Sequence, residues 1–111
     1  MNENDILKKV RAGELAANNG TIIRTLGMLG LDYQYLRLRV LQTTLADSMG
    51  RAAMCSAINY LADSGYILVR TVDEHAPASV SDAEPELLEI KLSPAGTRIQ
   101  RGVEKDPLIE L

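Results

Sequence analysis

The sequence predicts an α+β protein that is mostly helical, and a helix that turns directly into a strand carries this prediction. Residues 51–64 place apolar side chains at helical spacing, so one face of this segment is suited to a core. Gly65 follows, at the point where a helix needs a residue that tolerates positive φ in order to end. The run Tyr66-Ile67-Leu68-Val69 is then suited to a buried strand that reaches Val72, and residues 87–92 alternate as a second strand does.

Composition sets the class of protein. The chain has 111 residues, 46% of them hydrophobic, without Trp or Phe, so we expect one domain with an aliphatic core. No apolar run approaches the roughly 18 residues of a membrane span, and the first residues are acidic and polar, unlike a secretion signal. We therefore expect a cytoplasmic protein with no membrane contact. One Cys and one His exclude an internal disulfide and a structural zinc site.

The first third of the chain predicts two helices. Residues 5–17 form the first, and residues 18–20, Asn-Asn-Gly, are a strong turn signal. Thr21 is suited to cap a second helix that ends at Gly30. The apolar positions of the leading helix are Ile6, Leu7, Val10 and Leu15.

A short strand and a third helix are expected next. Residues 31–35 predict the strand, because their two tyrosines alternate. The alternation continues beyond them, so a longer strand is an alternative. A helix is favoured, because Leu38, Leu41 and Leu45 fall at i, i+3 and i+7, and residues 47–50 then supply a turn.

The last third contains an acidic loop, a helix and a tail. Residues 73–86 contain two prolines and lack periodicity, which predicts a loop between the two strands. Ser93 and Pro94 are suited to begin a helix that ends at Gly102. Residues 103–111 are expected to be irregular, although they contain apolar side chains.

This order of elements resembles the winged helix-turn-helix superfamily. Residues 57–67, Ala-Ile-Asn-Tyr-Leu-Ala-Asp-Ser-Gly-Tyr-Ile, are similar to its helix–wing join. Residues 92–99, Leu-Ser-Pro-Ala-Gly-Thr-Arg-Ile, are similar to the segment after its wing, and residues 102–110 resemble the ending of small regulators of Mu-like phages and prophages. The resemblance divides the chain into an N-terminal helix and turn (1–20), a winged-helix domain with a two-stranded wing and a short C-terminal helix (21–102), and a C-terminal tail (103–111).

The resemblance implies that the 51–64 helix enters the major groove of double-stranded DNA as in a transcription regulator. Arg51 has the donors to pair with guanine, Asn59 the donor and acceptor to pair with adenine, and Ser56 a hydroxyl for a base or a phosphate. The expected phosphate contacts, which with Arg51 would form one basic patch, are Arg37, Arg39 and Arg70.

The charge balance favours a different use of the same fold. The net charge is −3, and the 73–86 loop contains five acids and no base, whereas a wing in the minor groove normally presents bases. A module that contacts another protein and binds no DNA is therefore the alternative. The sequence contains no nucleophile–base pair and no phosphate-binding Gly-rich loop, so we expect neither an enzyme nor a cofactor.

A DNA-binding protein with one short recognition helix is expected to act as a homodimer, because two half-sites multiply its specificity. The leading helix and the apolar tail are the expected dimer surfaces, since neither is needed for the winged core.

Overall fold

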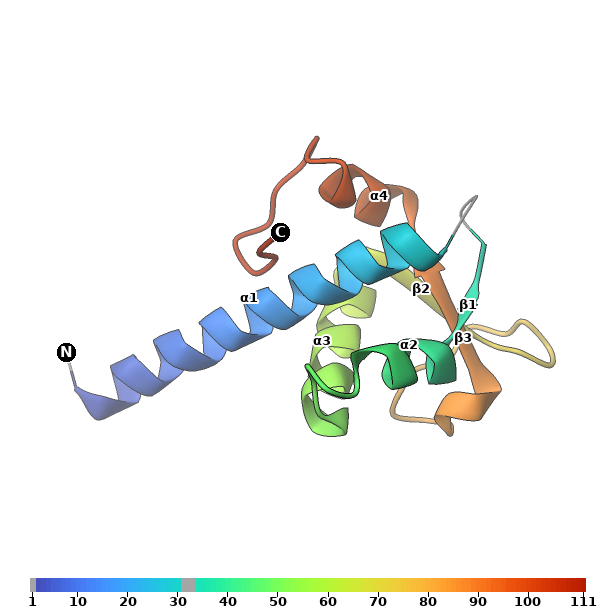
Figure 1. Ribbon diagram of the computed structural model, residues 1–111, viewed down its shortest axis with the longest axis horizontal. Helices are drawn as coiled ribbons and strands as arrows, with labels where there is room; N and C mark the ends of the chain where they lie inside the picture. The colour runs from blue at the N-terminus through green and yellow to red at the C-terminus, as the bar shows by residue number, and fades with distance from the viewer. Residues whose placement is uncertain (1, 31–33) are drawn as a thin grey trace.

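The computed structural model describes residues 2–30 and 34–111, and within them the chain forms four α-helices and a three-stranded antiparallel sheet (Figure 1). The predicted α+β class is therefore confirmed. The elements in order are α1 (Glu3–Leu29), β1 (Leu36–Arg37), α2 (Leu38–Leu45), α3 (Arg51–Asp63), β2 (Ile67–Thr71), the 3₁₀ helix η2 (Pro85–Leu87), β3 (Leu88–Leu92) and α4 (Pro94–Gln100).

The sheet has the order β1-β3-β2, with β3 in the centre. Its inner face is aliphatic: Ile90 pairs with Leu36 on one side and with Val69 on the other. The helices pack on this face and complete one core with the apolar sides of α1, α2 and α3. None of the helices in the described part of the chain is long and apolar enough to cross a membrane.

Two of the predicted helices, α2 and α3, are confirmed together with the turn between them. Leu38, Leu41 and Leu45 of α2 are buried, as their spacing predicts. The alternative of a longer strand is wrong beyond Arg37, where the chain changes from β1 to α2. The predicted strand at 31–35 falls partly on residues 31–33, which lie outside the described residues, and the observed strand is Leu36–Arg37.

The helix ends predicted at Gly30, Gly65 and Gly102 are all confirmed, and those at Gly65 and Gly102 share one geometry. After α3, the N–H of Gly65 donates to the carbonyl of Ala62 at 3.0 Å, and that of Tyr66 donates to Leu61 at 2.9 Å. This pair of hydrogen bonds is a Schellman motif, which requires positive φ at the glycine. Gly65 has φ +81°, and Gly102, which ends α4 in the same way, has φ +76°.

The prediction of a turn at residues 18–20 is wrong, because α1 continues through it as one helix. Asn19 is fully buried and its Nδ2 donates to the carbonyl of Leu108 at 2.8 Å. Gly20 faces the backbone of the C-terminal segment so closely that a Cβ would lie 1.6 Å from the carbonyl oxygen of Glu110. Here Asn and Gly serve tertiary packing, which overrides their turn preference.

The predicted irregular tail has no helix or strand, but it packs on α1. The N–H of Glu110 donates to the carbonyl of Ala16 at 2.9 Å, and Ile109 is buried in the core. The predicted loop 73–86 is also more ordered than expected: Pro77 forms a β-bridge with Arg70, and η2 begins at Pro85.

We predict that Gly65→Val destabilises the protein by about 1–3 kcal/mol, because a β-branched residue is strained at positive φ. A Cβ at this position meets no atom within 4 Å, so the loss measures backbone strain alone. Urea unfolding gives the difference in free energy.

Gly65→Asn is the matched control, because Asn also adds a side chain at this position but tolerates positive φ. It is expected to lose less stability than Gly65→Val. Equal losses in both variants would contradict the role assigned to positive φ.

Candidate nucleic-acid interface

The outward face of α3 is the part of the molecule that corresponds to the predicted reading surface. Met54, Ile58 and Leu61 are buried against α1 and the sheet. At 100° per residue, Ser56 and Asn59 lie on the opposite side of the helix. Ser56 is exposed and Asn59 is half-buried, so both predicted side chains lie together on this face, which ends in the acid Asp63.

Arg51 lies in the first turn of α3, at the edge of this face. Its Nη2 is 3.9 Å from Oε2 of Glu84, in the loop before η2, and both side chains are more than 70% exposed. An ion pair so exposed and so long contributes little to stability. It does place a carboxylate beside the one basic residue of α3.

Arg70 is held within the sheet by Glu89 and Tyr35. Its Nε and Nη2 both donate to Oε2 of Glu89, at 3.0 and 2.9 Å, and its guanidinium stacks 3.6 Å from the centre of the Tyr35 ring. The two charged side chains are mostly covered, at 27% and 12% exposure. A phosphate contact by Arg70 would therefore compete with an existing charge-assisted pair.

The four arginines of the expected basic patch lie in different parts of the fold. Arg37 and Arg70 are both register partners of Glu89, so they flank it in one row on the outer face of the sheet. Arg39 follows in the first turn of α2 and is exposed. Arg51 begins a helix that packs on the inner side of the sheet. The structure thus brings Arg37 and Arg70 together, with an acid between them.

Tyr35 and Lys91 also belong to this outer row, although neither was predicted from the sequence. The Tyr35 ring has the Arg70 guanidinium over it and the Nζ of Lys91 at 4.9 Å from its centre. Strand alternation does place Arg70, Glu89 and Lys91 on one face, but their contact depends on the register of β2 against β3.

A second cluster of polar side chains fastens the tail to α3 and to the start of β2. The hydroxyls of Tyr60 and Tyr66 both donate to Oδ2 of Asp106 at 2.8 Å, and the N–H of Leu108 donates to Oδ1 at 2.8 Å. Burial alone would raise the pKa of the Asp106 carboxyl, but these three hydrogen bonds outweigh it and hold the pKa below its ordinary value. The bond to Asp106, followed by burial, raises the pKa of Tyr66 to about 12.

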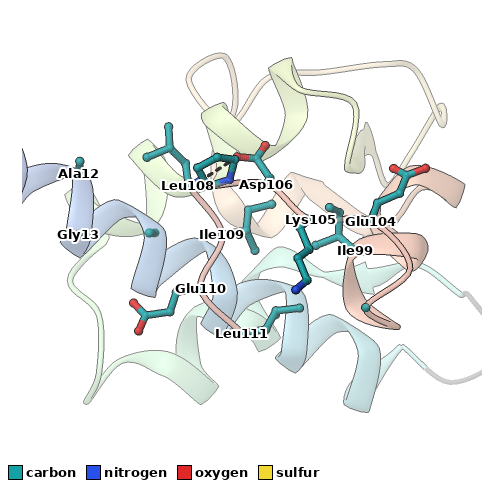
Figure 2. A pocket seen from close by; sticks show the side chains of 13 residues that line it. Ala12, Gly13, Ile99, Glu104, Lys105, Asp106, Leu108, Ile109, Glu110 and Leu111 are labelled. Atoms are coloured by element: carbon teal, nitrogen blue, oxygen red, sulfur yellow. Dashed lines mark hydrogen bonds between the residues drawn. The ribbon is translucent and has the colours of Figure 1, made fainter.

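A groove of about 920 Å³ runs between α1, α4 and the tail (Figure 2). Its lining includes Gly13 and Ala16 from α1, Ile99 from α4 and Ile109 from the tail. Most of the lining is apolar, and its charged side chains are those of Glu104, Lys105, Asp106 and Glu110. Across residues 2–30 and 34–111, no cluster of His, Cys, Asp or Glu is arranged to hold a metal ion.

Comparison of the chain with protein-family models, curated proteins and solved structures gives no match. Functional inference therefore depends on the side chains themselves.

We predict that the Asp106 cluster makes stability depend on pH at both ends of the scale. A carboxyl whose pKa is lowered by folding stabilises above its unfolded pKa, and this stabilisation is lost as pH falls through the folded value. The raised pKa of Tyr66 acts in the opposite direction, so its stabilisation is lost as pH rises from 10 towards about 12. Urea midpoints measured from pH 3 to pH 12 are expected to fall at both ends.

Asp106→Asn is expected to cost about 1–3 kcal/mol at neutral pH and to flatten the acid limb. Asp47→Asn is the control, because Asp47 is exposed in the turn after α2. An unchanged acid limb in Asp106→Asn would show that other carboxylates cause it.

Proposed function

We propose that the chain is a winged-helix DNA-binding protein that regulates transcription, with α3 as the helix that enters the major groove. The observation that supports this best is the uncovered face of α3, together with the order of the elements on either side of this helix. A short turn joins α2 to α3, and α3 runs directly into the β2–β3 hairpin to which β1 adds an edge strand. This is the element order of winged-helix proteins, in which the second helix of the pair reads DNA.

Base contacts in this proposal come from the middle and the start of α3. The Asn59 amide has the donor and acceptor for adenine, and the exposed Ser56 hydroxyl supports it one turn earlier. Arg51 is at the edge, with a side chain 72% exposed, and it pairs with guanine once it leaves Glu84. Three polar side chains supply modest specificity in one copy.

Phosphate contacts in this proposal come from Arg37 and Arg39, which are both exposed. Arg70 takes a supporting role instead: by stacking on Tyr35 and pairing with Glu89, it fixes the segment that leads into β1. The acidic loop stays away from the DNA, because the phosphates repel its carboxylates. A protein with this role acts in the cytoplasm, where DNA is accessible.

A module that contacts another protein is the second candidate, and the charges around α3 favour it. Asp63 ends the outward face of the helix, and Glu84 lies 3.9 Å from its arginine. A basic partner surface would be attracted by these two acids, whereas DNA would not.

We predict that Arg51→Ala weakens binding to a cognate duplex by about 1–3 kcal/mol, the value of one good base contact. Arg37→Ala is expected to weaken all duplexes nearly equally and to reduce the slope of log affinity against log salt by about one. Fluorescence anisotropy with random and genomic duplexes at two salt concentrations measures both effects.

Arg24→Ala is the control for these substitutions, because Arg24 is an exposed arginine on α1. It is expected to leave binding unchanged. Absence of binding by the parent protein at low salt would exclude the DNA-binding proposal and leave the protein-contact module.

We also predict that the Asp82→Asn, Glu84→Gln double variant binds random duplexes more tightly, since it removes the carboxylate beside Arg51 and a second acid of the same loop. The Glu14→Gln, Glu110→Gln double variant is the control for charge alone, because it removes two exposed acids outside the loop. Equal tightening in the control would indicate that net charge, and not the position of the loop, sets the affinity.

A further inference from the structure

The first half of α1 extends beyond the rest of the molecule. Residues 3–14 are all exposed, and in Figure 1 this part of the helix projects away from the other elements. Burial begins only at Leu15 and Ala16, where the tail packs on the helix. The projecting segment nevertheless contains three large apolar side chains that are half exposed: Ile6 at 51%, Leu7 at 50% and Val10 at 51%.

These side chains form a stripe that faces away from the core of their own molecule. In the second half of α1, the core side includes Ile23 and Leu26. At 100° per residue, Leu7 lies about 160° around the helix axis from Ile23, and Val10 about 160° from Leu26. The apolar face of α1 therefore changes sides along the helix, and none of the elements formed by residues 2–30 and 34–111 covers the stripe.

The tail, the other expected dimer surface, is largely used within the molecule. Ile109 is buried, Asp106 is hydrogen-bonded to Tyr60 of α3 and to Tyr66 just before β2, and Glu110 is hydrogen-bonded to α1. Residues 3–14 extend α1 without tertiary packing, which supplies most of the stability of helices in proteins, and Gly13 weakens this extension further. The projecting half of α1 is thus the surface left in need of a partner.

We infer that residues 3–11, within this projecting segment, pair with the same residues of a second copy, in antiparallel orientation. The two stripes pack around a two-fold axis near Leu7, so that Leu7 contacts its equivalent in the other copy. This is an isologous interface, in which one patch complements itself. The inference concerns assembly and does not depend on the proposed DNA binding.

The charges of the segment favour a second copy of the same chain as its partner, and they favour one orientation of the two helices. Among residues 3–11, acids lie in the first turn, at Glu3 and Asp5, and bases follow at Lys8, Lys9 and Arg11, while the acid Glu14 lies beyond the paired residues. Antiparallel pairing about Leu7 places Glu3 of one copy opposite Arg11 of the other. Parallel pairing would place acid against acid and base against base, which is repulsive. The segment is therefore complementary to itself in one orientation only.

The interface is short. At 1.5 Å per residue, the nine residues 3–11 span about 14 Å, so the contact is smaller than the standard interface of about 800 Å² per partner. The dimer is consequently expected to dissociate on dilution.

Sedimentation equilibrium of the full chain without DNA, from low to high micromolar concentration, tests the inference. The parent protein is expected to change from monomer to dimer, and Leu7→Lys is expected to remain a monomer. Val103→Lys is the matched control, because Val103 is a 71% exposed aliphatic residue outside α1. A parent protein that stays monomeric, or a Leu7→Lys variant that dimerises like the parent, would overturn the inference.

A charge exchange tests the orientation. Glu3→Lys and Arg11→Glu are each expected to weaken the dimer, and the double variant to restore it, because the pair then has opposite charges again. Failure of the double variant to restore association would overturn the antiparallel arrangement. These experiments contain no DNA, so they test association separately from DNA binding. A monomer that binds DNA would overturn this inference alone, and a dimer that binds no DNA would overturn the proposed function alone.

Discussion

The packing of the C-terminal segment on α1 is the constraint on which the rest of the structure depends. Asn19 and Gly20 lie within α1, yet their contacts are with Leu108 and Glu110, at the other end of the chain. Any side chain at Gly20 would collide with the tail backbone, so the close approach requires glycine. Asp106 then joins the same tail to α3 and β2 through two tyrosine hydroxyls. One short segment thereby fixes the long helix against the helix proposed to read DNA.

The elements that could be predicted from sequence are those whose signals are local. The leucines of α2, the apolar face of α3 and the glycine at its end each act within a few residues, and all are confirmed. The Asn-Asn-Gly segment failed as a turn because the partner that decides its conformation is about 90 residues away in the chain. No local pattern contains that contact. The same holds for the tail, whose apolar side chains signal burial but not against which surface.

For the candidate site, too, the features set by local sequence were predicted and those set by distant contacts were not. Ser56 and Asn59 lie on the outward face of α3, as helical spacing requires. The environment of the arginines was harder to predict, because an exposed arginine can still have an ion-pair partner. Arg70 points outward as expected, but the register of β2 and β3 places Glu89 beside it and Tyr35 beneath it. Arg51 meets Glu84 only because the long loop returns past the start of α3.

The proposed DNA binding and the inferred pairing through α1 are connected by the charge of the chain. A chain of net charge −3, with a carboxylate beside the single base of its reading helix, gains little from phosphate neutralisation in one copy. Specificity would then depend on base contacts, and one copy offers only the three α3 side chains proposed to make them, Arg51, Ser56 and Asn59. Pairing through the projecting half of α1 leaves the outward face of α3 uncovered. Association would therefore double the number of base contacts, because the side chains that make them are not part of the dimer interface. The face change along α1 is what makes this possible: its second half covers the core of one copy, and its first half is free for another.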